Sequence, residues 1–404
     1  MTRRVLGRQA SFLAAAAIVA HTIWTSAAPA LSYPLYAQQW HLTTFTTTAI
    51  FAVYPVFVVL VLVLFGNLSD YIGRREAMVA GLTFSALGSL IFAVAPDVDW
   101  IFFGRAFMGV GVGLSAGPSA AAVVEFSPPH RVGQAGSVTA AAQGLGMVGA
   151  ALIGGALIQY APLPLRLNFA VLTVVLAALI VLTWFLPNHT ASRAAGHWRP
   201  RLPAIPNGVF AVFVASTAAV TGSYVLGAMT LSLGAQVARD VVASSNALVN
   251  GGTIALFALA STLATIPARK LAASRVILSG GLAAIASSAL LALAAVEHSL
   301  GLYMVAQAGA GIAYSWLLLG GLSLINAHLP ITHRAATLSA LFLVAYLAQA
   351  VVALSLGRIA TVYGLSTAVD IGVGTIAVLA AVTLLLDLVR QKTGPLRSRH
   401  RQQR

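Results

Sequence analysis

Cysteine is absent from this chain of 404 residues, and charged residues are scarce, at 8%. The missing cysteine excludes disulfides, thiolate metal sites and cysteine nucleophiles. The scarcity of charge excludes a soluble globular protein, because such proteins carry about 25% charged residues at their surface. Apolar residues take their place: 59% of the chain is hydrophobic, and its mean hydropathy is +0.90. These values predict a protein that crosses a membrane many times.

Long apolar segments follow one another along the whole chain. A helix that crosses a bilayer needs about 20 such residues, and the segments satisfy this length. We predict spans at 11–33, 45–66, 77–96, 99–123, 134–159, 166–186, 208–231, 245–266, 276–296, 300–324, 336–356 and 366–389. The predicted fold class is an all-α membrane protein of 12 transmembrane helices, with both termini on one side.

The second half of the chain repeats the first. An offset of 200 places Gly109 and Gly111 on Gly309 and Gly311. Between the halves, a segment rich in proline and arginine interrupts the apolar pattern. We predict a six-helix half at 1–187, a linker at 188–207, a second six-helix half at 208–390 and a basic tail at 391–404.

Basic residues are distributed unevenly over the two faces. Of the 23 Lys and Arg residues, Arg166, Arg239 and Arg358 fall on one face, Arg105 falls inside a span, and the others fall on the face with both termini. Because Lys and Arg collect on the cytoplasmic side, the termini are predicted to be cytoplasmic. The net charge of +14 then indicates contact with anionic lipid headgroups rather than nucleic acid. The alternative, a cleaved N-terminal signal, would leave 11 spans and basic loops on both faces.

A charged turn joins the second and third spans. Gly66, Asp70, Gly73, Arg74 and Arg75 form the pattern G-x-L-S-D-x-x-G-R-R. This pattern resembles the signature loop of the major facilitator superfamily of transporters, in particular bacterial members that exchange drugs for protons. The resemblance implies a secondary transporter of two six-helix halves in a bacterial inner membrane. It further implies a monomer that needs a small-molecule substrate but no cofactor, and that is not an enzyme.

The resemblance also implies a role for Asp70. In the family, this Asp lies near the start of the eleventh helix when the protein is closed to the cytoplasm, where the helix dipole favours negative charge. The corresponding residues here are 334–338, and the contact would latch the halves in one state. The alternative is that Asp70 only caps its loop and pairs with Arg74 or Arg75. One departure is Tyr71, because the family usually has a basic residue there.

The fourth span contains a buried arginine followed by glycines. Its pattern R-x-x-x-G-x-G, from Arg105 to Gly111, resembles a second family motif that is associated with proton coupling. An arginine at the centre of a membrane helix costs about 2.5–3.5 kcal/mol, so Arg105 is a candidate coupling residue. The alternative is that its side chain reaches the outer face and pairs with Asp97 or Asp99. Gly109 and Gly111 are predicted to pack against neighbouring helices.

The fifth span contains Gly146, Gly154 and Gly155 in the spacing of the family's antiporter motif. The central Gly-Pro of that motif is replaced by Ala150-Ala151, so the close packing is expected to persist without the bend. This spacing favours efflux.

Polar residues at mid-membrane are few, and no acidic residue lies in the middle of the first, fourth, fifth, seventh or eighth span. Cation selectivity based on a buried carboxylate is therefore doubtful. His21 is a candidate proton carrier, because histidine titrates near neutral pH; the alternative is a neutral ring bonded to a neighbouring helix. The candidate cavity residues are Trp24, Thr25, Gln143, Thr221, Tyr224, Asn246, Asn250, Gln307, Tyr314, Trp316, Tyr346 and Gln349.

Together these patterns predict efflux of small organic compounds by proton antiport. Uptake or facilitated diffusion of a specific metabolite is the alternative. A membrane sensor would need an output domain, and a membrane-embedded enzyme would need a nucleophile, a metal cluster or paired acids. The sequence offers none of these, so both are distant alternatives.

Overall fold

The structure is a computed structural model. It describes residues 5–128, 135–187, 198, 203–206, 208–329 and 331–401, without the side chains of 331, 332, 335 and 392–401. Within these residues it consists of helices and connecting turns, with no strand. Most of the predicted linker 188–207 lies outside the described residues, and so does the start of the basic N-terminus.

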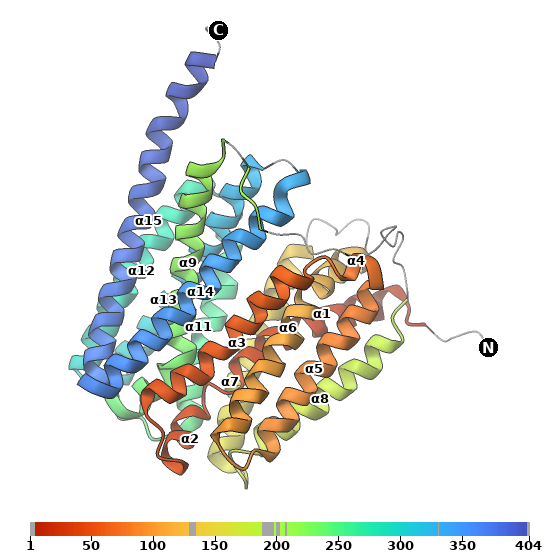
Figure 1. The fold of residues 1–404 in the computed structure, drawn as a ribbon. Coiled ribbons are helices and arrows are strands. Elements are labelled where there is room, and N and C mark those ends of the chain that lie inside the picture. The colour runs from red at the N-terminus through yellow and green to blue at the C-terminus, as the bar shows by residue number, and fades with distance from the viewer. Residues whose placement is uncertain are drawn as a thin grey trace.

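The predicted all-α fold with 12 transmembrane helices is confirmed, since 12 of the helices are long and apolar enough to cross a membrane. The first half forms α1 (Arg8–Ala27), α2 (Tyr33–Gln39), α3 (Thr44–Phe65), α4 (Ser69–Ile72), α5 (Arg74–Val94), α6 (Val98–Phe126), α7 (Ala135–Tyr160) and α8 (Leu167–Trp184). The second half forms α9 (Phe210–Ser232), α10 (Gly234–Gln236), the π-helix η2 (Val237–Val241), α11 (Ala247–Ala268), α12 (Ala273–Val296), α13 (Leu300–His328), α14 (Ile331–Tyr363) and α15 (Leu365–Arg401). Figure 1 shows their order in space.

The first span is shorter than predicted. α1 ends at Ala27 rather than at residue 33, because Pro29 has no backbone N–H to donate and its ring clashes with the preceding turn. The chain then turns and forms the separate helix α2, with Pro34 in its first turn, where proline is tolerated. In contrast, Pro55 and Pro118 lie inside α3 and α6.

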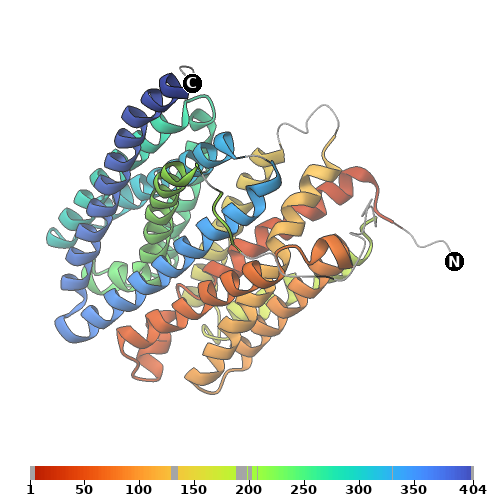
Figure 2. The same cartoon turned by 45° about the horizontal axis from the view of Figure 1, so that its top comes forward.

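The helices form two groups side by side, α1–α8 and α9–α15, in both views (Figures 1 and 2). The start of α1 and the end of α15 lie at the same end of the bundle as α4 (Figure 1). We call this the motif end, because the 66–76 turn forms it. The opposite end, which holds α2, is called the distal end.

Two helix pairs carry most of the packing between the groups: α7 with α11, and α3 with α14. Small residues allow this close approach. Gly251 on α11 lies against the backbone of Ala151, and Gly357 on α14 lies against the side chain of Thr48, so close that neither glycine has room for a Cβ. The outward faces of the spans are apolar, for example at Phe103 and Val174, which are 62% and 70% exposed, as expected of a surface in contact with lipid.

Candidate functional site

A cavity of about 340 Å³ lies between the two groups of helices. On α7 its lining residues fall between Gly136 and Met147, and on α11 they fall between Phe257 and Thr265. Both ranges belong to the parts of these helices nearest the motif end, since α7 begins at that end and α11 finishes there. The cavity therefore extends from the middle of the bundle toward the motif end.

At the distal end the two groups are joined by hydrogen bonds. The Phe45 N–H of α3 donates to the Thr361 hydroxyl of α14 over 2.9 Å. The Ala247 N–H at the start of α11 donates to the Gln159 side chain of α7 over 2.7 Å. Arg239, in η2, adds to these bonds by donating to the carbonyl of Pro34, in the first turn of α2, over 3.2 Å. These bonds close the cavity on the distal side.

Four tyrosines from four helices line the cavity. They are Tyr54 on α3, Tyr224 on α9, Tyr314 on α13 and Tyr346 on α14. The rings of Tyr224 and Tyr346 meet edge to face with centroids 4.8 Å apart. The ring centroids of Tyr314 and Phe257, which is on α11, are 5.5 Å apart. Each tyrosine combines an aromatic body with a hydroxyl that can donate or accept a hydrogen bond.

The remaining lining is mostly apolar, with a few uncharged polar side chains. Gln143 of α7, Gln349 of α14 and Ser26, just before the end of α1, are among them. The described lining residues include no Asp, Glu, Lys, Arg or His. Ligand sites in proteins have volumes of about 300–1,000 Å³ and are largely apolar with a few placed polar groups. The cavity fits this description at its smaller limit.

Arg105 of α6 lies directly behind one wall of the cavity and is 0% exposed. Its Nη1 donates to the carbonyl of Ser26 over 3.3 Å, and its Nε donates to the carbonyl of Ile50 over 3.4 Å. The guanidinium carbon lies 4.6 Å from the centre of the Tyr54 ring and 6.0 Å from that of Phe51, within the range of cation–π attraction. Arg105 therefore does not extend to the distal face.

The two acids that could have drawn Arg105 outward, Asp97 and Asp99, are exposed at the start of α6. The Asp97 carboxylate accepts from the backbone N–H groups of Asp99 and Trp100 and caps the helix. Within the described residues, no ion pair joins Arg105 to any acid.

His21 lies in the interface between α1 and α6, outside the cavity lining. It is 2% exposed. Its Nδ1 is bonded to the carbonyl of Ile18, which can only accept, so this nitrogen carries a proton. Its Nε2 faces the Ser115 hydroxyl at 3.4 Å.

The 66–76 turn is organised by Gly73, whose φ of 108° is a conformation that favours glycine. This residue ends α4 and begins α5. Arg74 pairs with Glu125 of α6 at 2.5 Å, and Arg75 pairs with Glu76 at 3.0 Å. Both arginines thus have partners other than Asp70, whose side chain is exposed. Gly66 comes directly after α3, with its Cα hydrogens against the preceding turn of that helix.

The glycines singled out in α6 and α7 all face other helices. Gly109 faces α3, Gly111 faces α5, Gly146 faces α1, Gly154 faces α8 and Gly155 faces α11. At Gly155, an added Cβ would lie 2.8 Å from a backbone carbonyl of α11, which leaves no room for a side chain.

The structure brings five of the predicted cavity residues together: Gln143, Tyr224, Tyr314, Tyr346 and Gln349 all line the cavity. The others lie elsewhere. Trp24 packs beside Gly149 of α7, while Thr25 and Thr221 are buried with unpartnered hydroxyls. Asn246 caps α11, Asn250 donates to the carbonyl of Ser244, and Trp316 donates to the carbonyl of Ala264.

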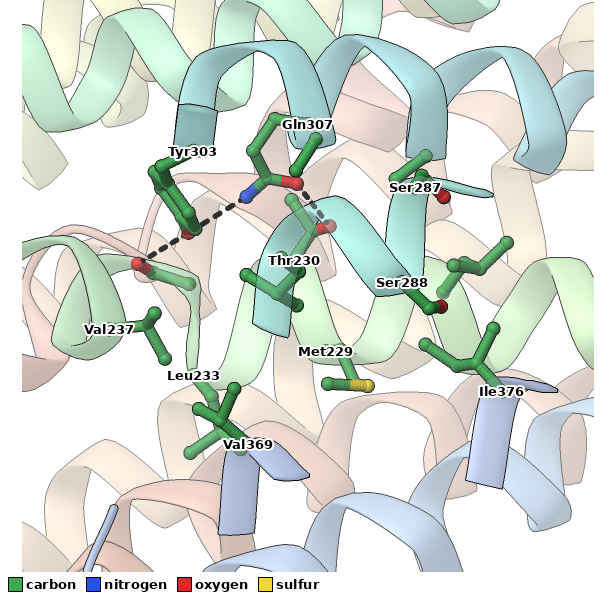
Figure 3. Close-up of a pocket in the computed structure, with 15 residues that line it drawn as sticks. Met229, Thr230, Leu233, Val237, Ser287, Ser288, Tyr303, Gln307, Val369 and Ile376 are labelled. Carbon is green, nitrogen blue, oxygen red and sulfur yellow. Dashed lines mark hydrogen bonds between the residues drawn. The ribbon is translucent and has the colours of Figure 1, made fainter. Parts of the chain in front are cut away.

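Gln307 belongs to a second, much smaller pocket inside the second half. This pocket, of about 40 Å³, lies among α9, α12, α13 and α15 (Figure 3). Gln307 donates to the Tyr303 hydroxyl over 2.8 Å and accepts from the Thr230 hydroxyl at 3.3 Å. Tyr303 in turn donates to the carbonyl of Gly234 over 2.9 Å. Because these hydrogen bonds hold its side chain within the second half, Gln307 does not line the central cavity.

Sequence reasoning missed Phe51, Tyr54 and Phe257, and the hydroxyls of Ser261 and Thr262, all of which line the cavity. Nothing in an evenly apolar segment marks the face that points inward. Tyr54, a polar-tipped ring beside Pro55, carried a usable signal.

The sequence profile of the Major Facilitator Superfamily matches residues 13–275. An MFS-type transporter of Aspergillus terreus is 31% identical over 190 residues, or 42% of this chain and 32% of that protein. Puromycin resistance protein pur8 of Streptomyces alboniger is 36% identical over 101 residues, or 24% of this chain and 20% of that protein. The matches thus span a third or less of these relatives' lengths.

Solved structures share the fold across the whole chain. A bacterial homologue of the human lysosomal transporter Spinster, in an inward-facing and unoccupied conformation, superposes with a TM-score of 0.73 at 15% identity. The superposition covers 95% of this chain and 98% of that one. With the family profile covering more than half of the residues, the chain belongs to the Major Facilitator Superfamily of membrane transporters.

Proposed function

We propose that this transporter works by alternating access and exports small, largely apolar organic compounds in exchange for protons. The observation that carries the proposal is the cavity of about 340 Å³ between the two halves, lined by four tyrosines and free of charged side chains among its described residues. Such a lining suits an aromatic or aliphatic solute with few polar groups.

The state of the structure follows from which end of the cavity is closed. Hydrogen bonds join the halves at the distal end, while the cavity reaches toward the motif end. The excess of Lys and Arg at the motif end supports the proposal that this end, with both termini, faces the cytoplasm, in a bacterial inner membrane. The conformation is then the one that loads substrate from the cytoplasm.

Asp70 is proposed to latch the motif end in the opposite state. Its exposed carboxylate is free of Arg74 and Arg75, which pair with Glu125 and Glu76. When the halves close at the cytoplasm, the carboxylate can approach the first turn of α14, where the helix dipole favours negative charge.

Proton coupling is proposed to involve His21 and Arg105. The imidazole of His21, on α1, faces the Ser115 hydroxyl of α6. Arg105, also on α6, donates hydrogen bonds to backbone carbonyls of α1 and α3. Both residues are therefore buried within the first half, next to the helices α1 and α3 that line the cavity. Export is favoured by the packing glycines of α7 and by the name of the puromycin resistance relative.

Everted membrane vesicles from cells that overproduce the protein test the proposal. The vesicles are energised, and a pH-sensitive dye follows the acid interior while lipophilic compounds are added singly. Release of protons on addition of a compound, strongly reduced with Asp70→Asn, is the expected result. Accumulation of compound with no proton signal would point to another coupling ion and remove His21 as the carrier. Silence across the panel would favour uptake of a specific metabolite.

A further inference from the structure

Arg105 is a buried positive charge that no acid neutralises. All nine acids of the chain lie within the described residues, and the four ion pairs formed there join Glu125, Glu76, Asp240 and Asp387 to arginines other than Arg105. The nearby Tyr33 phenol on α2 is no substitute, because burial raises its pKa and keeps it neutral. The buried guanidinium thus has no counter-ion among the described residues.

The hydrogen bonds of this guanidinium are also incomplete. It carries five N–H donors, of which Nε and Nη1 bond to two backbone carbonyls. Nη2 is buried and has no partner. Burying a charge without a counter-ion or a full set of hydrogen bonds costs free energy. An anion that approached Arg105 would offset part of this cost, which would stabilise the bound anion.

The cavity is where such an anion can approach. Ser26, Phe51 and Tyr54 each contact Arg105, and the same three residues line the cavity. The guanidinium therefore lies directly behind the residues that form this wall of the cavity. Because the lining carries no charge of its own and the surroundings are apolar, the field of the guanidinium is weakly screened inside the cavity.

The other walls complete the description of an occupant. Hydroxyls of Tyr54, Tyr224, Tyr314 and Tyr346 provide donors for an oxyanion, and rings of Phe51 and Phe257 provide an apolar surface. No carboxylate in the described lining is available to hold an ammonium group. Through the field of Arg105, we propose that the cavity selects lipophilic organic monoanions, namely carboxylates attached to an aromatic or aliphatic body, over their neutral and cationic analogues.

This inference rests on the proposed function only in taking the cavity as the substrate site, and it can be tested without transport. Biphenylcarboxylate, its primary amide and biphenylmethylamine differ at one polar group and fit the available volume. Their binding to the full-length protein, purified in detergent, is measured by calorimetry. We expect the carboxylate to bind at least about tenfold more tightly than the amide, a difference of about 1.4 kcal/mol, and the amine to bind most weakly.

Substitutions at Arg105 separate a role of charge from a role in packing. Arg105→Gln is expected to bring carboxylate and amide affinities within about twofold of each other by weakening carboxylate binding alone. Arg105→Lys keeps the charge and retains part of the preference, which guards against a misfolded variant. Arg358→Gln removes an exposed arginine of α14 and serves as the matched control.

Three results would overturn the proposal: an unchanged preference in Arg105→Gln, tightest binding of the amine, or no carboxylate binding by the wild-type protein. Equal weakening of all three probes in Arg105→Gln also contradicts it, because that pattern indicates a positioning residue. Failure of the proposed proton antiport would appear in the vesicles instead and would leave the binding result intact.

Discussion

The two halves share one architecture but differ in what they bury. In the first half, α6 carries the charged Arg105, which is bonded to backbone carbonyls of α1 and α3. At the repeat-related position of α13 stands Val305, which is 55% exposed. The second half buries the neutral chain of Tyr303, Gln307 and Thr230 instead.

The halves also differ in the contacts that hold their helices together near the motif end. The 66–76 turn ties α5 to α6 through Arg74 and Glu125. In the second half, the start of α12 is tied to α15, because Arg390 and Asp387 both bond to the Ser274 hydroxyl. The repeat thus supplies the scaffold twice, while Arg105 and Asp70, the two charges proposed to respond to substrate and to closure, both lie in the first half. The predictions below test this division.

The largest effect is expected at Arg105. In everted vesicles, Arg105→Gln should reduce compound-driven proton release at least about tenfold, because the cavity loses its field. Gln307→Leu, in the neutral chain of the second half, should reduce it less than about threefold. Similar losses in both variants would show that the halves do not differ in function.

Asp70→Asn ranks second. The transport rate should fall by up to about tenfold, because the neutral side chain loses its interaction with the helix dipole. Folding should be unaffected, since Asp70 is exposed and gives up no ion pair in this state. The control is Arg269→Gln, which changes an exposed arginine between α11 and α12. Normal kinetics in Asp70→Asn, measured at equal amounts of protein, would rule out the latch.

Repeat-related glycines provide a third comparison. At Gly109 an added Cβ lies 2.7 Å from the backbone oxygen of Tyr54, whereas at Gly309 it lies 3.0 Å from the Cβ of Ser287. Overpacking costs about 1–3 kcal/mol, so Gly109→Ala should lower the thermal midpoint more than Gly309→Ala. Gly117→Ala on α6, where the added atom meets open space, is the control. The reverse order would contradict this reading of the packing.

The smallest effect is expected at Tyr303→Phe. The change removes the hydroxyl that donates to Gly234 and accepts from Gln307, which should lower stability by about 0.5–1.5 kcal/mol. Transport should remain within about twofold of wild type, because this pocket is separate from the cavity. Thermal unfolding and the vesicle assay measure the two quantities, and a strong transport defect would join the pocket to the mechanism.

Sequence reasoning was most successful where the signal was length or a local pattern. Runs of about 20 apolar residues located the transmembrane helices because each must satisfy its own backbone in lipid. It failed at the first span, where a proline ended α1 early. Five of its twelve cavity residues line the cavity, and the other seven lie elsewhere. Gln307 and Trp316 lie in the same helix as Tyr314, yet they bond away from the cavity.

The sequence by itself determined the membrane location, the family and the 66–76 turn, because hydrophobicity, charge bias and a short motif are local properties. Only the tertiary structure decided which side chains meet. Helices that are apolar on every side give no periodic signal for the face that turns inward. Packing of α3 against α14 and α7 against α11 placed Tyr54 beside the other tyrosines and left Arg105 behind them without an acid, an arrangement no single segment encodes.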